Sequence, residues 1–265
     1  GGLGHYVCQA ATALGWTTLV PPSTELNITN HKGIDDYMRE HSPDAILHLA
    51  ALANVDLCQR EPQAAVNLNT LATLTLATLA KAKIVFMSTN DVFSELVDAD
   101  IDGPYDTQTV PAPGNVYAWS KYAGEQAVLA AGGVVVRANF FTRRCRAKES
   151  FVSYVLRNAQ EGRPFDCYTN VVSSPVFAGT LAKIFCELVP RPSGVFHVSA
   201  VDSINRHEQA QEICHAYGLD SSFVQPKLLE NRAGRPLDAR LTPSSCIEPL
   251  YVQEEISKLR AAEPL

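Results

Sequence analysis

The strongest constraint on this fold is the regular alternation of short apolar runs with longer helical patterns in the first half of the chain. Four runs have the length and β-rich composition of strands: Thr17 to Val20, Ala45 to Leu49, Lys83 to Ser88 and Gly133 to Arg137. Helical patterns accompany them at His5 to Leu14, Gly33 to Glu40, Pro62 to Ala80 and Asn115 to Ala131. Such lengths suit crossovers between parallel strands, which predicts an α/β fold with a doubly wound parallel sheet.

The second half of the chain is divided by prolines into shorter elements. One strand is expected at Gly194 to Ser199, and the expected helices are Glu149 to Gln160, Phe177 to Leu188, His207 to Tyr217 and Tyr251 to Ala261. We therefore predict a large sheet domain over residues 1–140, to which residues 170–200 return. Residues 141–169 and 201–265 form a smaller second lobe.

Composition narrows the classes of function. The formal net charge is −6 and the sequence pI is about 5.6, which argues against a nucleic-acid partner. No apolar run approaches the roughly eighteen residues of a membrane span, and no signal peptide opens the chain, so we expect a cytoplasmic protein without membrane contact. Neither the seven cysteines nor the seven histidines have metal-site spacing, so no metal is expected.

The first four residues, Gly1, Gly2, Leu3 and Gly4, lead directly into a helical pattern. Glycines there let backbone amides at a helix N-terminus approach a pyrophosphate, as in the later part of a dinucleotide-binding loop. An ordinary flexible terminus is the alternative. The first strand and first glycine of such a loop are missing, so we expect the natural protein to carry roughly ten further residues ahead of Gly1, a strand and a turn.

A tyrosine and a lysine four residues apart, Tyr117 and Lys121, fall within the fourth helical pattern. On a helix they share one face, where the ammonium can favour the tyrosinate and so ease proton transfer. A solvated surface pair is the alternative. About thirty residues upstream, a buried strand ends at Ser88 and Thr89, and a hydroxyl there can donate to a substrate carbonyl or simply cap a helix. The three features in this order are more specific than any one.

Together these motifs resemble the extended short-chain dehydrogenase/reductase superfamily, in its dTDP-4-dehydrorhamnose reductase-like, sugar nucleotide-binding branch. The resemblance runs from Gly1 to about Leu241. The matching segments are Leu26 to Thr29, Pro43 to Ala51, Val55-Asp56 with Glu61-Pro62, Val66-Asn67, Ser88-Thr89 with Val92-Phe93, Asn115 to Glu125, Ser174 to Val176, Gly194 to His197 and Arg235-Pro236.

The resemblance implies a Rossmann-like fold and an NAD(P)H-dependent reductase of a nucleotide-linked keto-deoxysugar. Tyr117 would be the general acid, Lys121 would tune it and hold the nicotinamide ribose, and Thr89 would polarise the ketone. The implied cofactor-binding residues are Gly1, Gly2, Leu3, Gly4, Asn27, Ile28, Ala50, Ala51, Ala53, Asn67, Ser88 and Lys121. The implied substrate-binding residues, between the lobes, are Asn90, Asp91, Asn139, Phe140 and Arg235.

Three departures from the family pattern concern substrate and cofactor. Asn90 and Asp91 replace an acid and an aromatic residue, and Phe140 stands where relatives have a tryptophan. A related 4-keto or 3-keto deoxysugar therefore fits as well as the rhamnose precursor. The segment ending at Ser23 lacks the acidic residue that commonly binds the ribose of NAD, which favours NADP(H) over NAD(H).

Two other functions stay open at this point. One is a non-catalytic, NADP-binding regulatory subunit resembling that of methionine adenosyltransferase, a relative that can keep the same three residues. The other is a nucleotide-sugar epimerase or dehydratase, for which the sequence offers no further acid or base. A homodimer is a further possibility, since it is common among relatives.

Overall fold

Four parallel strands form the central sheet, in the order β1 (Ala45–His48), β2 (Lys83–Met87), β3 (Val134–Ala138) and β8 (Gly194–Val198). The computed structural model describes residues 1–79, 81–95, 103–143, 149–230, 232 and 234–265. Strands β1, β2 and β8 lie within predicted segments, and β3 ends one residue beyond the segment predicted for it. The predicted doubly wound α/β fold is confirmed.

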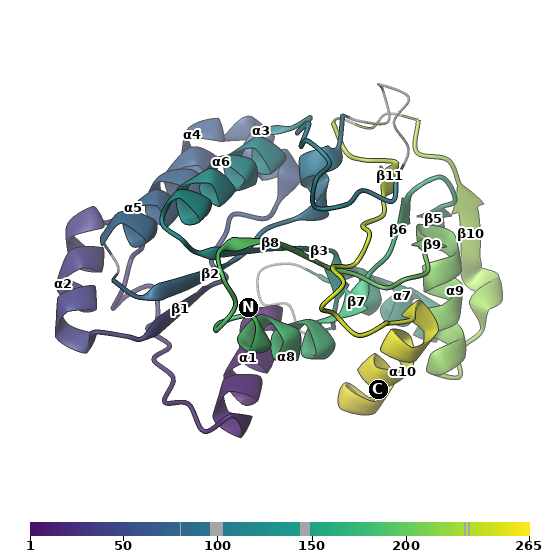
Figure 1. Cartoon of the computed structure of the whole chain (residues 1–265). Coiled ribbons are helices and arrows are strands. Elements are labelled where there is room, and N and C mark those ends of the chain that lie inside the picture. Colours follow the sequence, from purple (N-terminus) through teal and green to yellow (C-terminus); the bar gives the residue numbers. More distant parts are fainter. Residues whose placement is uncertain (80, 96–102, 144–148, 231, 233) are drawn as a thin grey trace.

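Helices cover both faces of the sheet (Figure 1). On β2, Ile84 and Phe86 pack with residues of α2 (His31–His41), α5 (Ala72–Leu79) and α6 (Val116–Ala130). The alternate residues Val85 and Met87 belong to the core on the other face, with α1 (Gly2–Ala13) and α8 (Ala178–Glu187). Because side chains alternate between the faces of a strand, a run that is apolar throughout requires a cover on both sides.

The predicted helix over residues 62–80 is divided in the structure. It consists of α4 (Pro62–Ala65), a π-helical turn η1 (Val66–Leu71) and α5, and a further short helix, α3 (Val55–Arg60), precedes it. Helix α6 begins where predicted, since the Asn115 side chain accepts a hydrogen bond of 2.9 Å from the Ala118 N–H. That cap fixes the start of the helix that carries Tyr117 and Lys121.

The strand predicted at Thr17 to Val20 is wrong. The segment pairs with no strand of the described residues, and it leaves Leu19 and Val20 about half or more exposed, at 50% and 65%. Its composition favours a strand, but a strand is stable only beside a hydrogen-bonded neighbour. Of the described strands, β1 pairs only with β2, so it lies at an edge of the sheet.

The right-hand part of the molecule in Figure 1, termed the second lobe, consists of short strands and three helices. It includes residues 172–177, which the prediction assigns to the sheet domain, and it shares one hydrophobic core with the sheet. Its helices are α7 (Phe151–Gln160), α9 (Arg206–Ala216) and α10 (Val252–Ala262). Its strands are β4 (Phe140–Phe141) with β7 (Val176–Phe177), β5 (Phe165–Tyr168) with β10 (Val224–Lys227), and β6 (Val172–Ser173) between β9 (Ile204–Asn205) and β11 (Asp238–Ala239). Apart from β8, none of the strands after β3 was predicted, because two to four residues carry too little periodicity.

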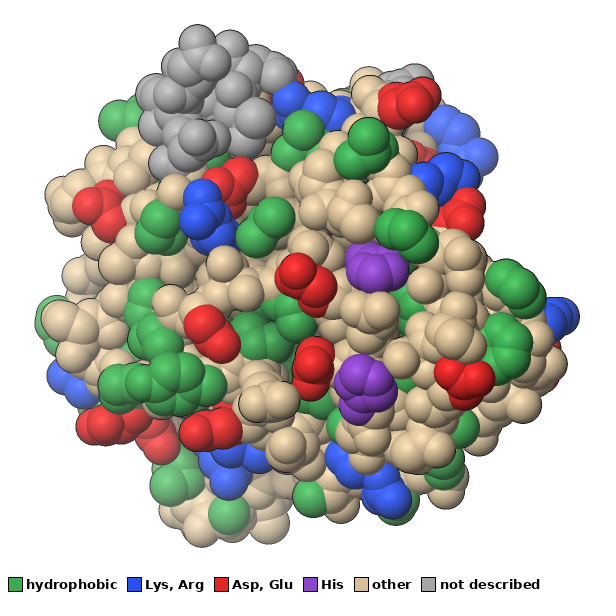
Figure 2. All heavy atoms as spheres, turned by 90° about the vertical axis from the view of Figure 1, so that its right-hand side faces the viewer, with side chains coloured by type: hydrophobic (Ala, Val, Ile, Leu, Met, Phe, Trp, Pro, Cys, Tyr) green, Lys and Arg blue, Asp and Glu red, His purple; other side chains and the backbone are tan. Residues whose placement is uncertain are grey.

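The outer face of this lobe mixes acidic, basic and hydrophobic side chains without a large area of one kind (Figure 2). Among the described residues, no helix is long and apolar enough to cross a membrane.

Candidate functional site

The carboxyl end of β2 and the first turns of α6 bring Thr89, Tyr117 and Lys121 into one region. Thr89 caps the short helix η2 (Asn90–Phe93) directly after β2, and its hydroxyl oxygen accepts a hydrogen bond of 3.1 Å from the Asp91 N–H. The Thr89 side chain also hydrogen-bonds with Tyr117. The Thr89 hydroxyl, at the end of β2, and the Tyr117 phenol, on α6, therefore lie next to each other.

Tyr117 is set up to keep its proton at neutral pH. Burial raises the pKa of the Tyr117 hydroxyl above its usual range, and the charges of Asp91 and the Cys58 thiol add to this, while the hydrogen bond with Thr89 opposes it. At neutral pH Tyr117 is thus a neutral phenol, the form that can donate a proton.

Lys121 lies one turn further along α6 and is only 2% exposed. Its Nζ is 3.9 Å from the centroid of the Phe86 ring and donates no hydrogen bond to a residue that the structure describes, but it is not a fully enclosed atom and keeps a little contact with solvent. Burial lowers the pKa of Lys121 to about 7, although Glu125 opposes this. A buried ammonium without a hydrogen-bond acceptor is unfavourable unless a ligand supplies one.

His48, at the end of β1, is a neighbour of Lys121. Burial, aided by the charge of Lys121, lowers the pKa of His48 to about 3, and its Nε2 lies 2.9 Å from the Thr73 hydroxyl. The imidazole is therefore neutral at physiological pH and adds no charge to the site.

Asp91 faces the second lobe. Burial raises the pKa of its carboxyl to about 6, and the positive charges of Arg206 and Arg235 and the hydrogen bond with Thr89 oppose this rise. Arg206 opens α9 and donates a 2.8 Å hydrogen bond to Oε1 of Gln209, whose buried Nε2 has no partner among the described residues. Arg206 thus acts on the Asp91 carboxylate through its charge, without an ion pair between them among the described residues.

The neighbouring Asn90 has a different partner. Its Nδ2 donates a 3.0 Å hydrogen bond to the Ala239 carbonyl, and the side chain is 2% exposed. Arg235, also predicted near the substrate, forms an ion pair with Asp56 on α3, at 2.5 Å between Nη2 and Oδ1. Both contacts join the two lobes around the site.

The glycine-rich start of the chain lies near the carboxyl end of β1, at the same edge of the sheet as the end of β2. Gly1 caps α1 without a side-chain hydrogen bond, and no acidic residue occupies the first turn, so the first N–H groups of α1 have no side-chain acceptor there. A Cβ on Gly4 would lie 3.8 Å from Leu49, which directly follows β1. The predicted residues Ala50, Ala51 and Ala53 continue from that point, so these two groups are close neighbours.

The remaining predicted residues have varied surroundings. Asn27 is exposed and accepts hydrogen bonds from Thr29, while Ile28 packs beside the core under α2. Asn67 accepts a 2.8 Å hydrogen bond from Gln63, and the Ser88 hydroxyl donates to Glu125. Asn139 and Phe140 follow β3, where Phe140 is 37% exposed.

Several residues that sequence reasoning missed support the site. The Asn69 side chain, fully buried, bonds both backbone groups of Leu52 and the Ser120 hydroxyl, which fixes the loop after β1 against α6. Arg206 comes from the other lobe, and Glu125 contacts β2 and β3. In the sequence, the role of Asn69 is indicated only by its position two residues after the predicted Asn67.

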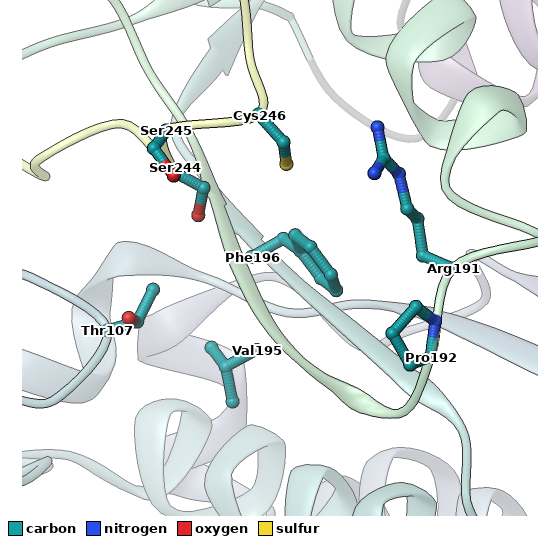
Figure 3. A pocket seen from close by; sticks show the side chains of 8 residues that line it. All are labelled: Thr107, Arg191, Pro192, Val195, Phe196, Ser244, Ser245 and Cys246. Carbon is teal, nitrogen blue, oxygen red and sulfur yellow. The ribbon is translucent and has the colours of Figure 1, made fainter.

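A hollow of about 330 Å³ lies beside β8, at the opposite edge of the sheet (Figure 3). Phe196, Arg191 and Cys246 surround it, together with Thr107, Pro192, Val195, Ser244 and Ser245. None of the predicted site residues lines this hollow. It is therefore separate from the site at β2 and α6.

Comparison with known proteins places the chain among sugar-nucleotide reductases and their relatives. It is 29% identical over 233 residues to a dTDP-4-dehydrorhamnose reductase of Mycolicibacterium smegmatis, covering 85% of this chain and 69% of that protein. It is 28% identical over 250 residues to methionine adenosyltransferase 2 subunit beta of Danio rerio, covering 87% and 74%. Both relatives of the sequence analysis are thus found at similar identity.

A solved structure agrees over the whole fold. The dTDP-4-dehydrorhamnose reductase of Bacillus anthracis in complex with NADP superposes with a TM-score of 0.90 at 24% identity, covering 99% of this chain and 96% of that chain. The family model for the RmlD substrate binding domain matches residues 1–255. The predicted resemblance is confirmed, and the chain belongs to the RmlD substrate binding domain family.

Proposed function

We propose that this protein is an NAD(P)H-dependent reductase of a nucleotide-linked ketosugar. The observation that carries the proposal is the grouping of Thr89, Tyr117 and Lys121 at the carboxyl end of β2, where open α/β sheets bind their ligands. The names of the relatives, dTDP-4-dehydrorhamnose reductases among them, support the same reaction class.

The residues fit a nicotinamide dinucleotide. The N–H groups at the start of α1, from Gly2 to Gly4, have no side-chain acceptor and can bind a pyrophosphate. Lys121 Nζ, which donates no hydrogen bond to a described residue, can donate one to the oxygen of a ribose hydroxyl. When bound, the cofactor supplies the hydride. Ala50, Ala51 and Ala53, which follow β1, are the proposed neighbours of the adenosine.

The protein's own residues then handle the carbonyl oxygen. Thr89 and Tyr117 converge on one point, so both hydroxyls can donate to that oxygen and stabilise the charge that develops on it. Tyr117, neutral in the resting site, gives its proton to the oxygen. The ammonium of Lys121 favours the tyrosinate left behind, so the return of a proton from solvent completes the cycle.

The substrate lies between the lobes in this proposal. Asp91 can accept hydrogen bonds from sugar hydroxyls, and Arg206 and Arg235 supply positive charge for a diphosphate. Since Asp91 stands where relatives carry an aromatic residue, a 4-keto or 3-keto deoxysugar other than the rhamnose precursor is included. We favour NADPH over NADH, because the segment that ends at Ser23 carries no acidic side chain and the Bacillus anthracis relative was solved with NADP.

A cofactor-oxidation assay tests the proposal. NADPH and NADH are supplied in parallel with a panel of nucleotide-linked 4-keto and 3-keto deoxysugars, with Tyr117→Phe as the control. We expect oxidation with at least one sugar and its loss in the variant. Tight NADPH binding without turnover on any sugar would instead favour the regulatory role suggested by the similarity to methionine adenosyltransferase 2 subunit beta.

A further inference from the structure

A second buried charge lies next to the proposed catalytic residues. Glu125 on α6 is fully buried and accepts hydrogen bonds from Arg137, at 3.0 Å from Nε and 2.6 Å from Nη2. The Ser88 hydroxyl donates a third, at 2.5 Å. Ser88 and Arg137 are themselves only 4% and 3% exposed. The sequence motifs assign a role only to Ser88, as a cofactor-binding residue, and the proposed reaction assigns none to Glu125 or Arg137.

Strand register explains why they meet. Ser88 follows β2 two residues after Phe86, and Arg137 lies on β3 two residues after Val135, so both point toward α6 as Phe86 and Val135 do. Gly124 lets the helix approach, since a Cβ there would come within 2.9 Å of the Asn69 carbonyl and 3.0 Å of Phe86. This close approach brings Glu125 within hydrogen-bond distance of Ser88 and Arg137.

The same helix face carries Lys121. Lys121 and Glu125 are four residues apart and both are buried, so they lie one turn from each other on α6. The charge of Glu125 raises the pKa of Lys121, against the effect of burial. His48, which is neutral, also lies near Lys121, and Tyr117 stands one turn before it on α6. Among the described residues, Glu125 is the group whose charge supports the ammonium.

We propose that Glu125, fixed by Ser88 and Arg137, is a positioning residue that keeps Lys121 in its ammonium form next to Tyr117. The inference rests on the proposed function, because only there does the charge of Lys121 matter. It makes the packing of α6 on β2 and β3 part of the proton-transfer machinery. Glu125 itself contacts neither substrate nor cofactor in this scheme.

The test measures the titration of Lys121 directly. Protein labelled with ¹³C at the lysine side chains is titrated by NMR, and the Lys121 signal is assigned by its loss in Lys121→Arg. Glu125→Gln alone would leave Arg137 buried and unpaired, so the main variant is the double change Glu125→Gln with Arg137→Met. We expect the Lys121 midpoint to fall by about one pH unit. Ser88→Ala should move it in the same direction by less.

A matched control is available on α10. Glu255 is also fully buried, accepts from Lys258 at 2.6 Å and from the Phe177 N–H at 2.9 Å, and belongs to the other lobe. Glu255→Gln should lower the melting temperature without moving the Lys121 midpoint. An unchanged midpoint in the folded double variant would overturn the proposal. Should the double variant fail to fold, an unchanged midpoint in Ser88→Ala would do so.

A second readout connects the midpoint to catalysis. In the double variant, the alkaline limb of kcat/KM should move to lower pH together with the Lys121 midpoint, whereas a purely structural role would lower the rate equally at every pH. If the wild type turns over no ketosugar, the proposed function fails, yet the NMR titration still decides the role of Glu125.

Discussion

Two charged side chains are buried one turn apart on α6, and their surroundings differ sharply. Glu125 has three hydrogen bonds from Ser88 and Arg137, whereas Lys121 rests on the Phe86 ring without an acceptor. The first arrangement is typical of structural ion pairs, in which each buried charge is satisfied. The second leaves a largely buried charge with an aromatic ring and a little solvent as its surroundings, and such groups are typical of functional sites. The difference indicates that Lys121, and not Glu125, is the charge that a bound ligand contacts.

The largest expected effect comes from removing the unsatisfied charge. Lys121→Met should lower kcat/KM by about 10²–10³-fold, because the ammonium stabilises the charge left on Tyr117. Lys121→Arg keeps a charge that does not titrate near neutral pH, so its remaining activity should persist to higher pH than that of the wild type. Steady-state rates across pH measure both. Full activity in Lys121→Met would show that the two charges do not differ in function.

The same comparison predicts an effect on stability of the opposite sign. The folded pKa of Lys121, about 7, lies below its usual value of 10.5, so the buried ammonium destabilises the fold fully below pH 7 and progressively less as pH rises toward 10.5. Lys121→Met should therefore raise the free energy of unfolding by a few kcal/mol near pH 6. Urea unfolding at pH 6 and pH 10 measures it. If Lys121→Met raised the free energy of unfolding by the same amount at pH 6 and pH 10, the lowered pKa of Lys121 would be contradicted.

Asp91 should behave as a smaller counterpart of Lys121. Its folded pKa, about 6, lies above the usual 3.8, so its carboxylate destabilises the fold above pH 6 and not below pH 3.8. Asp91→Asn should add on the order of 1 kcal/mol of stability at pH 8 and weaken substrate binding. Unfolding curves and KM values measure the two effects. A loss of stability at pH 8 would instead make Asp91 a satisfied residue like Glu125.

The smallest effect is expected at an exposed ion pair. Asp56 and Arg235 form an ion pair between side chains that are 68% and 36% exposed, so solvent screens their attraction. A double-mutant cycle of Asp56→Asn and Arg235→Gln should give a coupling energy below about 1 kcal/mol. The KM of Arg235→Gln should nevertheless rise, because Arg235 also supplies charge near Asp91. A large coupling energy without a change in KM would make the pair a structural clamp.

The sequence predicts best what local periodicity determines. The strand over Lys83–Met87 and the helix over Val116–Ala130 follow from apolar spacing and the Asn115 cap, and with them Thr89, Tyr117 and Lys121 are placed correctly relative to the sheet. The strand at Thr17 to Val20 fails because a strand depends on a neighbour that its own residues do not specify.

Residues brought in by tertiary structure stay hidden from such reasoning. Glu125 meets Arg137 only through the register of β2 and β3, and Arg206 reaches Asp91 from a helix more than one hundred positions later in the chain. Asn90 and Asp91 are adjacent in the sequence, yet Asn90 donates to the Ala239 carbonyl, whereas the pKa of Asp91 responds to the charges of Arg206 and Arg235. No local sequence pattern distinguishes these two sets of interactions.

The most direct test of the central claim follows the hydride itself. Purified protein is incubated with NADPH carrying deuterium at the transferred position and with the best ketosugar of the panel, and the product is analysed by mass spectrometry and NMR. The proposed reductase predicts deuterium on the carbon that was the ketone, and loss of this label in Tyr117→Phe. Cofactor binding without any label in the sugar, or equal labelling by Tyr117→Phe, would contradict it.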